Sequence, residues 1–175
     1  STDLQRIGVV NQTTQLATET QAIADYLKQV MKDHYHLEET FIEERFADNR
    51  DTLCYATNDN QTAMNALLEV PADLAIVAGG YNSSNTTHLV ELAENKLPAY
   101  FINAADKIIS ASDILHYNIH TKEELISTGY LPSGTPVRIL MTSGASCPDS
   151  VVESIIRKLA GFYDVEKMLE TMTAD

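Results

Sequence analysis

The chain has 175 residues, 44% of them hydrophobic, which is enough for one folded domain or two small ones with packed cores. Its formal net charge of −13 argues against nucleic acid as the main partner, because phosphate backbones are bound by clustered Lys and Arg. No apolar run is long enough to span a bilayer and the N-terminus does not resemble a signal peptide, so we expect no membrane partner.

Short apolar runs alternate with helical patterns along the chain. The runs that predict strands lie at 7–10, 41–46, 52–56, 74–78, 99–103 and 137–141. A first helix is expected after Thr14, with one apolar stripe made by Ile23, Tyr26, Leu27, Val30 and Met31. Further helices are expected after a capping Thr57, at 86–94, around 110–120, and at 151–160 between Pro148 and Gly161.

This alternation predicts an α/β fold in which parallel sheets are flanked by helices. Such sheets bind ligands beyond the carboxyl ends of their strands. Four polar loops follow predicted strands and are therefore expected to meet at one rim: 11–14, 57–61, 82–85 and 142–146. A break near 48–51 separates a first α/β unit from a second.

The strongest local signal is the segment 73–85, which reads D-L-A-I-V-A-G-G-Y-N-S-S-N. A buried strand that runs through a donor-rich loop into a helix is a common way to build an anion site. The loop lacks the G-K-[ST] of a nucleotide P-loop and the G-x-G-x-x-G spacing. A turn in which Ser84 or Asn85 only caps the helix explains the same residues. Related loops at Thr13 and at 143–146 favour a shared anionic ligand, bound without lysine.

The two cysteines are too few for a disulfide scaffold, so reduced thiols in a cytosol-like compartment are expected. Cys54 ends a predicted strand and has no base nearby in the sequence, which favours a buried cysteine over a nucleophile. Cys147, at a helix entrance, is expected to be a small buried side chain.

The histidines give a weaker signal. His34 and His36 alternate as two ligands on a strand would, and His116 and His120 are spaced as two ligands on a helix would be. Neither pair has an evident third ligand, which favours surface or capping histidines.

Four segments carry a resemblance to a known family. They read V-V-N-Q-T-T at 9–14, D-T-L-C-Y-A-T-N-D-N-Q at 51–61, G-G-Y-N-S-S-N-T at 79–86 and T-S-G-A-S-C-P-D at 142–149. Together they resemble the 4-hydroxy-3-methylbut-2-enyl diphosphate reductases, the LytB or IspH family of isoprenoid synthesis. The long connection at 104–136 is similar to that of the plant and cyanobacterial branch. The resemblance covers nearly the whole chain, but only about the C-terminal half of a family member.

The resemblance implies an activity and a cofactor. Members of the family remove the hydroxyl of an allylic diphosphate alcohol with two electrons, which yields isopentenyl and dimethylallyl diphosphate in the non-mevalonate pathway. A [4Fe-4S] iron–sulfur cluster held by three cysteines leaves one iron open to the substrate, and Cys54 matches the last of these cysteines. The positions that match substrate-binding residues are Thr13, Ser83, Ser84, Asn85 and Ser146. The implied electron donor is a ferredoxin or flavodoxin, and the implied compartment is the bacterial cytoplasm or the plastid stroma.

The resemblance also implies a fold of three α/β units around a central cluster. This chain is expected to hold part of the second unit at 1–50, the third unit at 51–161, and a C-terminal tail at 162–175. The first two cluster cysteines, the substrate-binding histidines and the acidic proton donor have no match, so no catalytic residue is expected here. Asn60 stands where an arginine is usual, and Cys147 where a threonine or alanine is usual.

We therefore expect the chain alone to be inactive and to lack a retained cluster, with the N-terminal part of the same protein as its partner. Two alternatives remain. One is a non-enzymatic phosphate- or diphosphate-binding α/β domain, and the other is an interaction domain whose exposed faces pair with another chain.

Overall fold

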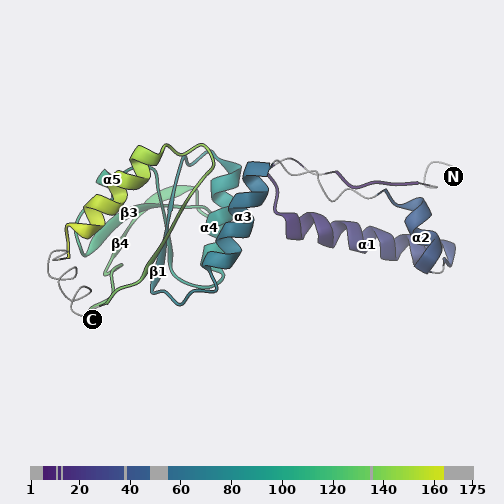
Figure 1. Cartoon of the computed structure of the whole chain (residues 1–175), viewed down its shortest axis with the longest axis horizontal. Helices are drawn as coiled ribbons and strands as arrows, with labels where there is room; N and C mark the ends of the chain where they lie inside the picture. The colour runs from purple at the N-terminus through teal and green to yellow at the C-terminus, as the bar shows by residue number, and fades with distance from the viewer. Residues whose placement is uncertain are drawn as a thin grey trace, which may run out of the picture. The chain divides into compact units, whose positions relative to one another are not determined.

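The computed structural model describes residues 6–163, apart from 11, 13, 38, 48–54 and 135. The chain divides into two units, Ser1–Gln61 and Thr62–Asp175. The helices and strands of both are labelled in Figure 1. The helix α3 (Tyr55–Leu67) crosses the boundary between the units. Among the described residues, no helix is both long enough and apolar enough to cross a membrane.

The first unit contains two helices, α1 (Ala17–Tyr35) and α2 (Glu39–Arg45). They enclose a small core of Met31, Ile42 and Phe46. A single parallel bridge joins Ile7 to Phe46, so the strand predicted at 7–10 is reduced to one paired residue. The strand predicted at 41–46 is wrong, because most of this segment forms α2 and only Phe46 is in a β-bridge.

The apolar stripe predicted for α1 is divided between two faces. Leu27 packs against the core that contains Met31, whereas Ile23, Tyr26 and Val30 are exposed. The helix ends at His36, which adopts a left-handed conformation with a φ of 51°. His34 therefore lies exposed in the last turn of a helix and His36 caps that helix, as the favoured interpretation of surface or capping histidines predicted, and the two are not ligands on a strand.

The second unit is built on a five-stranded sheet with the order β4-β3-β2-β1-β5. The central strand β1 (Leu74–Ala78) pairs in parallel with β2 (Ala99–Ile102) and with β5 (Ile139–Ser143). The strands β3 (Asp113–Asn118) and β4 (Glu123–Thr128) extend the sheet in antiparallel fashion. The predicted α/β class is confirmed, with a mixed sheet in place of a purely parallel one.

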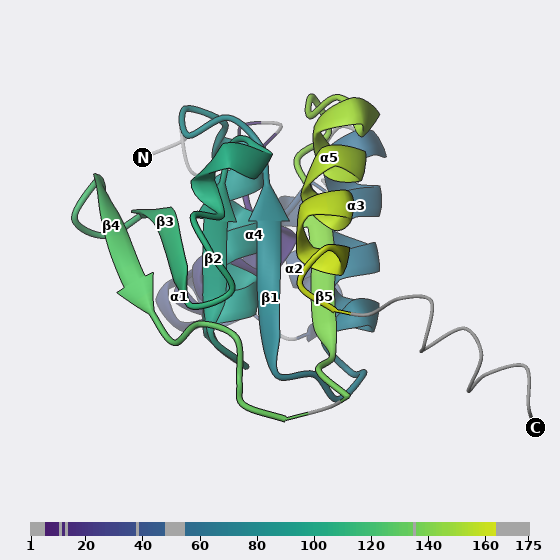
Figure 2. The same cartoon turned by 90° about the vertical axis from the view of Figure 1, so that its left-hand side faces the viewer.

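Helices cover both faces of this sheet, as Figure 2 shows with α5 on one side and α4 on the other. The helix α5 (Asp149–Ala160) buries Ile155 and Leu159 against Ile76 of β1. On the opposite face, α4 (Ser84–Glu94) and the end of α3 bury Leu89 and Met64 against the same strand. Because β1 alternates its side chains between two apolar cores, all five of its residues are buried.

The segment 110–120 contains strand β3 and the start of the turn that leads to β4, so the helix predicted there is wrong. A short 3-10 helix, η2 (Ala105–Lys107), precedes the β3–β4 hairpin. The side-chain oxygen of Asn118 accepts hydrogen bonds from the backbone N–H groups of His120 and Thr121, both at 2.9 Å. Lys122 completes the turn with a φ of 60°. His116 therefore lies in a strand and His120 in the turn that follows it, so the two histidines do not share a helical face.

Candidate anion-binding site

The candidate site lies at the carboxyl ends of the neighbouring strands β1 and β5. Their last residues, Ala78 and Ser143, face each other in the parallel register. The chain then turns away through Gly79 and Gly144, and the N–H of Gly144 donates to the carbonyl of Ala78 at 2.9 Å. The two polar loops predicted at 82–85 and 142–146 are therefore brought to the same edge of the sheet, which is where open α/β sheets bind ligands.

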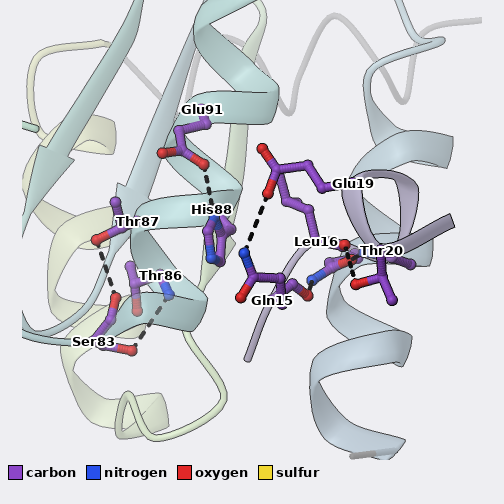
Figure 3. A network of polar contacts seen from close by, with 11 residues as sticks. Gln15, Leu16, Glu19, Thr20, Ser83, Thr86, Thr87, His88 and Glu91 are labelled. Carbon is purple, nitrogen blue, oxygen red and sulfur yellow. Dashed lines mark hydrogen bonds and ion pairs between the residues drawn. The ribbon is translucent and has the colours of Figure 1, made fainter. Parts of the chain in front are cut away.

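Ser83 fixes the start of α4. Its N–H donates to the carbonyl of Gly80 at 3.0 Å, which closes the turn before the helix. Its side-chain oxygen accepts from the N–H of Thr86 at 3.3 Å, and its carbonyl accepts from the hydroxyl of Thr87 at 3.1 Å. Figure 3 shows these contacts in the first turn of the helix. The helix-capping role that the sequence left open is thus performed by Ser83, one residue before Ser84.

Asn85 is buried without the hydrogen bonds that its side chain needs. Only 6% of the surface of Asn85 is exposed to solvent. Neither its amide nitrogen nor its amide oxygen has a hydrogen-bond partner among the described residues. The only other buried side-chain atom of this kind in the described part of the chain is Oγ1 of Thr86. Because each unpaired buried polar group costs about 1–3 kcal/mol, an unpaired asparagine points to a ligand that satisfies it.

Thr86 lies between Gly79 and Gly144, the two glycines that directly follow strands β1 and β5. It is fully buried, and a Cβ placed on Gly79 would lie 2.8 Å from its Oγ1 and 2.9 Å from its Cγ2. A Cβ placed on Gly144 would overlap the same oxygen and would lie 3.2 Å from the Thr86 Cβ. Both loops can therefore approach α4 closely only because they begin with glycine. This contact sets the spacing between the two loops.

The remaining predicted residues of this site lie at the surface. Ser84 is the first residue of α4 and is exposed, and Ser146 is exposed in the turn that precedes α5. Both are hydroxyl donors next to the N-terminal end of a helix, where the backbone N–H groups and the helix dipole favour an anion. The loops therefore offer neutral donors to an anion.

Cys147 lies beside Ser146 and shows no sign of activation. Its thiol is partly buried, and burial raises its pKa above the usual value for cysteine, with the nearby Asp149 acting in the same direction. Its Sγ lies 3.8 Å from the carbonyl of Pro148. A raised pKa keeps the thiol protonated, and Cys147 packs against the edge of the α5 core, although it is only partly buried and not the buried side chain that the sequence predicted.

Several predicted site residues lie in the first unit, and not all of them are described by the structure. Thr13 and Cys54 lie outside the described residues, as does most of the strand predicted at 52–56. The loop predicted at 57–61 is wrong, because Thr57 and Gln61 lie inside α3, which begins two residues before Thr57.

Gln61 has a contact that the sequence did not reveal. Its amide nitrogen donates to the carbonyl of Gln15 at 2.9 Å, and its amide oxygen accepts from the N–H of Ala17 at 3.1 Å. The side chain thereby satisfies one of the free N–H groups at the start of α1. Nearby, Gln15 also donates to Glu19, and the hydroxyl of Thr20 donates to Leu16 (Figure 3). Gln61 therefore holds the segment that follows the V-N-Q-T-T motif.

The histidines of the second unit each have a separate partner. His116 lies 2.9 Å from the hydroxyl of Ser127, and His120 lies 2.8 Å from a carboxylate oxygen of Glu94. His88 pairs with Glu91 at 2.7 Å. Within the described ranges, no three His, Cys, Asp or Glu side chains gather as a metal site would require. The described residues thus do not form a cluster site, and Cys54 is not among them.

Comparisons with known proteins agree with the resemblance. Residues 1–160 match the family model described as LytB protein. A 4-hydroxy-3-methylbut-2-enyl diphosphate reductase of Gloeobacter violaceus is 42% identical over 161 residues, which cover 90% of this chain and 37% of that protein. A reductase of the same name from Synechococcus sp. is 45% identical over 170 residues, covering 94% of this chain and 40% of that protein.

The chain thus spans about two fifths of the length of these curated relatives. Among solved structures, the E-1-hydroxy-2-methyl-but-2-enyl-4-diphosphate reductase from Plasmodium falciparum is similar with a TM-score of 0.56 and 23% identity. The match covers 89% of this chain and 39% of that one, and it supports the fold.

Proposed function

Since the chain belongs to the LytB protein family, we propose that it forms the diphosphate-binding part of a 4-hydroxy-3-methylbut-2-enyl diphosphate reductase. The unpaired side chain of buried Asn85 carries this proposal. A diphosphate oxygen would accept from its amide nitrogen, which has no acceptor among the residues that the structure describes. The hydroxyls of Ser84 and Ser146 and the N–H groups at the start of α4 would supply further donors.

These residues bind and orient; they do not perform the reduction. A diphosphate held by fixed donors presents the allylic end of the substrate in one direction, and the fixed geometry lowers the entropic cost of the reaction. An iron–sulfur cluster would supply the electrons in the complete protein, and Cys54 would be one of its ligands. The rest of the protein, a ferredoxin or flavodoxin as electron donor, and a cytoplasmic or plastid location complete the proposal.

Replacement of Asn85 by leucine tests the proposal. Leucine has a similar shape and needs no hydrogen bond, so the variant should be as stable as the wild type or more stable by about 1 kcal/mol. Its affinity for inorganic diphosphate should fall by at least about tenfold, because a charge-assisted hydrogen bond is lost. Isothermal titration with inorganic diphosphate and urea unfolding measure the two effects separately.

Asn82→Leu is the matched control. Asn82 lies in the same loop, but it is exposed and precedes the helix. The control should bind diphosphate as the wild type does if the buried amide is the decisive group. Equal affinity in the wild type and Asn85→Leu would refute the proposal. So would a marked loss of stability in Asn85→Leu, since it would mean that the side chain has protein partners.

A further inference from the structure

A row of three side chains crosses the sheet next to the loop 79–83, which leads from β1 to α4. In the register of the strands, Phe101 of β2 faces Tyr117 of β3, and Tyr117 faces Glu124 of β4. Phe101 and Tyr117 belong to the apolar core on the α4 face of the sheet, and Tyr81 packs against the same core. The row therefore reaches from the centre of the sheet to its antiparallel edge, on the side where the loop lies.

Tyr81, in the middle of the G-G-Y-N-S-S-N loop, contacts every member of this row. Its ring meets Phe101 edge-on, with centroids 5.1 Å apart, and stacks on Tyr117 at 4.5 Å with an interplanar angle of 13°. Its hydroxyl donates to Oε1 of Glu124 at 2.9 Å, across 43 residues of sequence. Aromatic pairs of this geometry contribute about 0.5–1.5 kcal/mol each, so the ring direction is well determined.

Glu124 is itself held in place by a charge. The ammonium of Lys107 lies 2.6 Å from the same Oε1. The hydrogen bond from Lys107 is the largest cause that lowers the pKa of Glu124, and the bond from Tyr81 is the next. Burial, aided by Glu124, raises the pKa of Tyr81 far above its usual value, so its hydroxyl remains a donor. Two donors, one from the loop and one from η2, thus converge on one carboxylate oxygen of β4.

Two consecutive glycines give the start of the loop conformational freedom, although the N–H groups of Gly79 and Ser83 donate to the carbonyls of Ile102 and Gly80. Tyr81 directly follows Gly79 and Gly80, and a Cβ placed on Gly80 would meet no atom within 4 Å. Glycine loses more conformational freedom on ordering than any other residue. An anchored Tyr81 limits the freedom of the residues between β1 and the helix cap at Ser83.

We propose that Glu124 is a positioning residue, which holds Tyr81 and through it orders the loop 79–83 for diphosphate binding. The identity of the ligand in this inference rests on the proposed function. The ordering of the loop by Glu124 does not depend on it. It also assigns a role to the β3–β4 hairpin, which brings the carboxylate of Glu124 into contact with the loop from a distant part of the chain. Glu124 need not touch the substrate.

The direction in which anion affinity changes when Glu124 is removed separates a positioning role from a purely electrostatic one. Glu124 carries a negative charge, and removal of a negative charge near an anion site strengthens anion binding when the charge acts only through its field. Loss of a positioning contact has the opposite effect. Glu123 is the matched control, since it is the neighbouring residue of β4, exposed and equally charged.

The experiment compares Glu124→Ala, Glu123→Ala and Tyr81→Phe in the 175-residue chain. Titration with inorganic diphosphate should show that Glu124→Ala and Tyr81→Phe each weaken binding by roughly three- to tenfold, the range expected for one partly exposed hydrogen bond to a charged group. The double variant should bind about as well as the weaker single variant, because both changes remove the same bond. Glu123→Ala should bind equally well or more tightly.

Hydrogen exchange without ligand decides the position of the loop. Amides in 80–83 should exchange several-fold faster in Glu124→Ala than in the wild type, while Glu123→Ala leaves them unchanged. Equal exchange in the two glutamate variants, or tighter binding by Glu124→Ala, would overturn the inference. If the wild-type chain binds no diphosphate but the exchange difference is present, the proposed function fails and the positioning of the loop by Glu124 is supported.

Discussion

The close approach of Gly144 to Thr86 gives the sharpest prediction for stability. In Gly144→Ala, the new methyl group would overlap Oγ1 of Thr86 and would lie 3.2 Å from its Cβ. Thr86 is fully buried in the first turn of α4, so it cannot swing into solvent. Either α4 or the loop after β5 must move, and overpacking of this kind costs about 1–3 kcal/mol.

The double-variant cycle with Thr86→Ala makes the prediction quantitative. Thr86→Ala alone removes a buried methyl group and a hydroxyl without a partner, which should cost about 1 kcal/mol. It also opens the space that the methyl group of Gly144→Ala needs. The double variant should therefore be about as stable as Thr86→Ala alone, with a favourable coupling of about 2 kcal/mol.

Urea unfolding of the four proteins measures this coupling, and a loss of about 2 kcal/mol corresponds to a fall in melting temperature of roughly 8 °C for a unit of this size. Gly80→Ala is the control, because a Cβ there would meet nothing within 4 Å, and it should change stability by less than about 0.5 kcal/mol. Additive effects of Thr86→Ala and Gly144→Ala, or a Gly144→Ala variant as stable as Gly80→Ala, would show that the loops are not spaced by Thr86.

Two further predictions concern protons and iron. Burial lowers the pKa of His116 below its ordinary value of 6.5, with Glu94 acting in the opposite direction. The unfolded chain therefore binds more protons than the folded one just below pH 6.5, and the free energy of unfolding falls as the pH drops through this range. His116→Gln should remove part of that fall, and urea unfolding at about pH 5 and about pH 8 checks it, with an unchanged pH dependence counting against it. Anaerobic reconstitution should leave far less than one four-iron cluster per chain, because such clusters need three or four protein ligands and Cys54 supplies one. Iron and sulfide analysis measures this, and a stable cluster would point to Cys147 or a histidine as an additional ligand.

The sequence predicted the central part of the second unit well, because the local and tertiary preferences there agree. The buried run at 74–78 is β1 to the residue, and the helices predicted at 86–94 and 151–160 begin only two residues late. At 110–120 the two kinds of signal conflicted. A helix was predicted there, but the turn at Asn118 folds the chain into a hairpin whose strands complete the sheet.

The candidate site was predictable in its residue types but not in its energetics. The resemblance implied that Ser83, Ser84, Asn85 and Ser146 bind the substrate, which stays a prediction, and the α/β pattern indicated that their loops share an edge. No local pattern could show that Asn85 is buried without a partner, or that Gly144 lies against Thr86. Both facts depend on how β1 and β5 pair across more than sixty residues of sequence, as does the hydrogen bond at Arg138, which joins residues 65 apart.

The net charge of the chain makes this site physically different from one built of lysines. A protein with a net charge of −13 repels a diphosphate at long range, although salt screens that repulsion beyond about 8 Å. The binding energy must therefore come from donors in direct contact, held in place before the ligand arrives. On the proposed function, an asparagine that is buried without a partner among the described residues costs about 1–3 kcal/mol, and its donor would already be desolvated before a diphosphate binds. If the proposed role of Glu124 is correct, the order that it imposes on Tyr81 must outweigh its screened repulsion of the ligand.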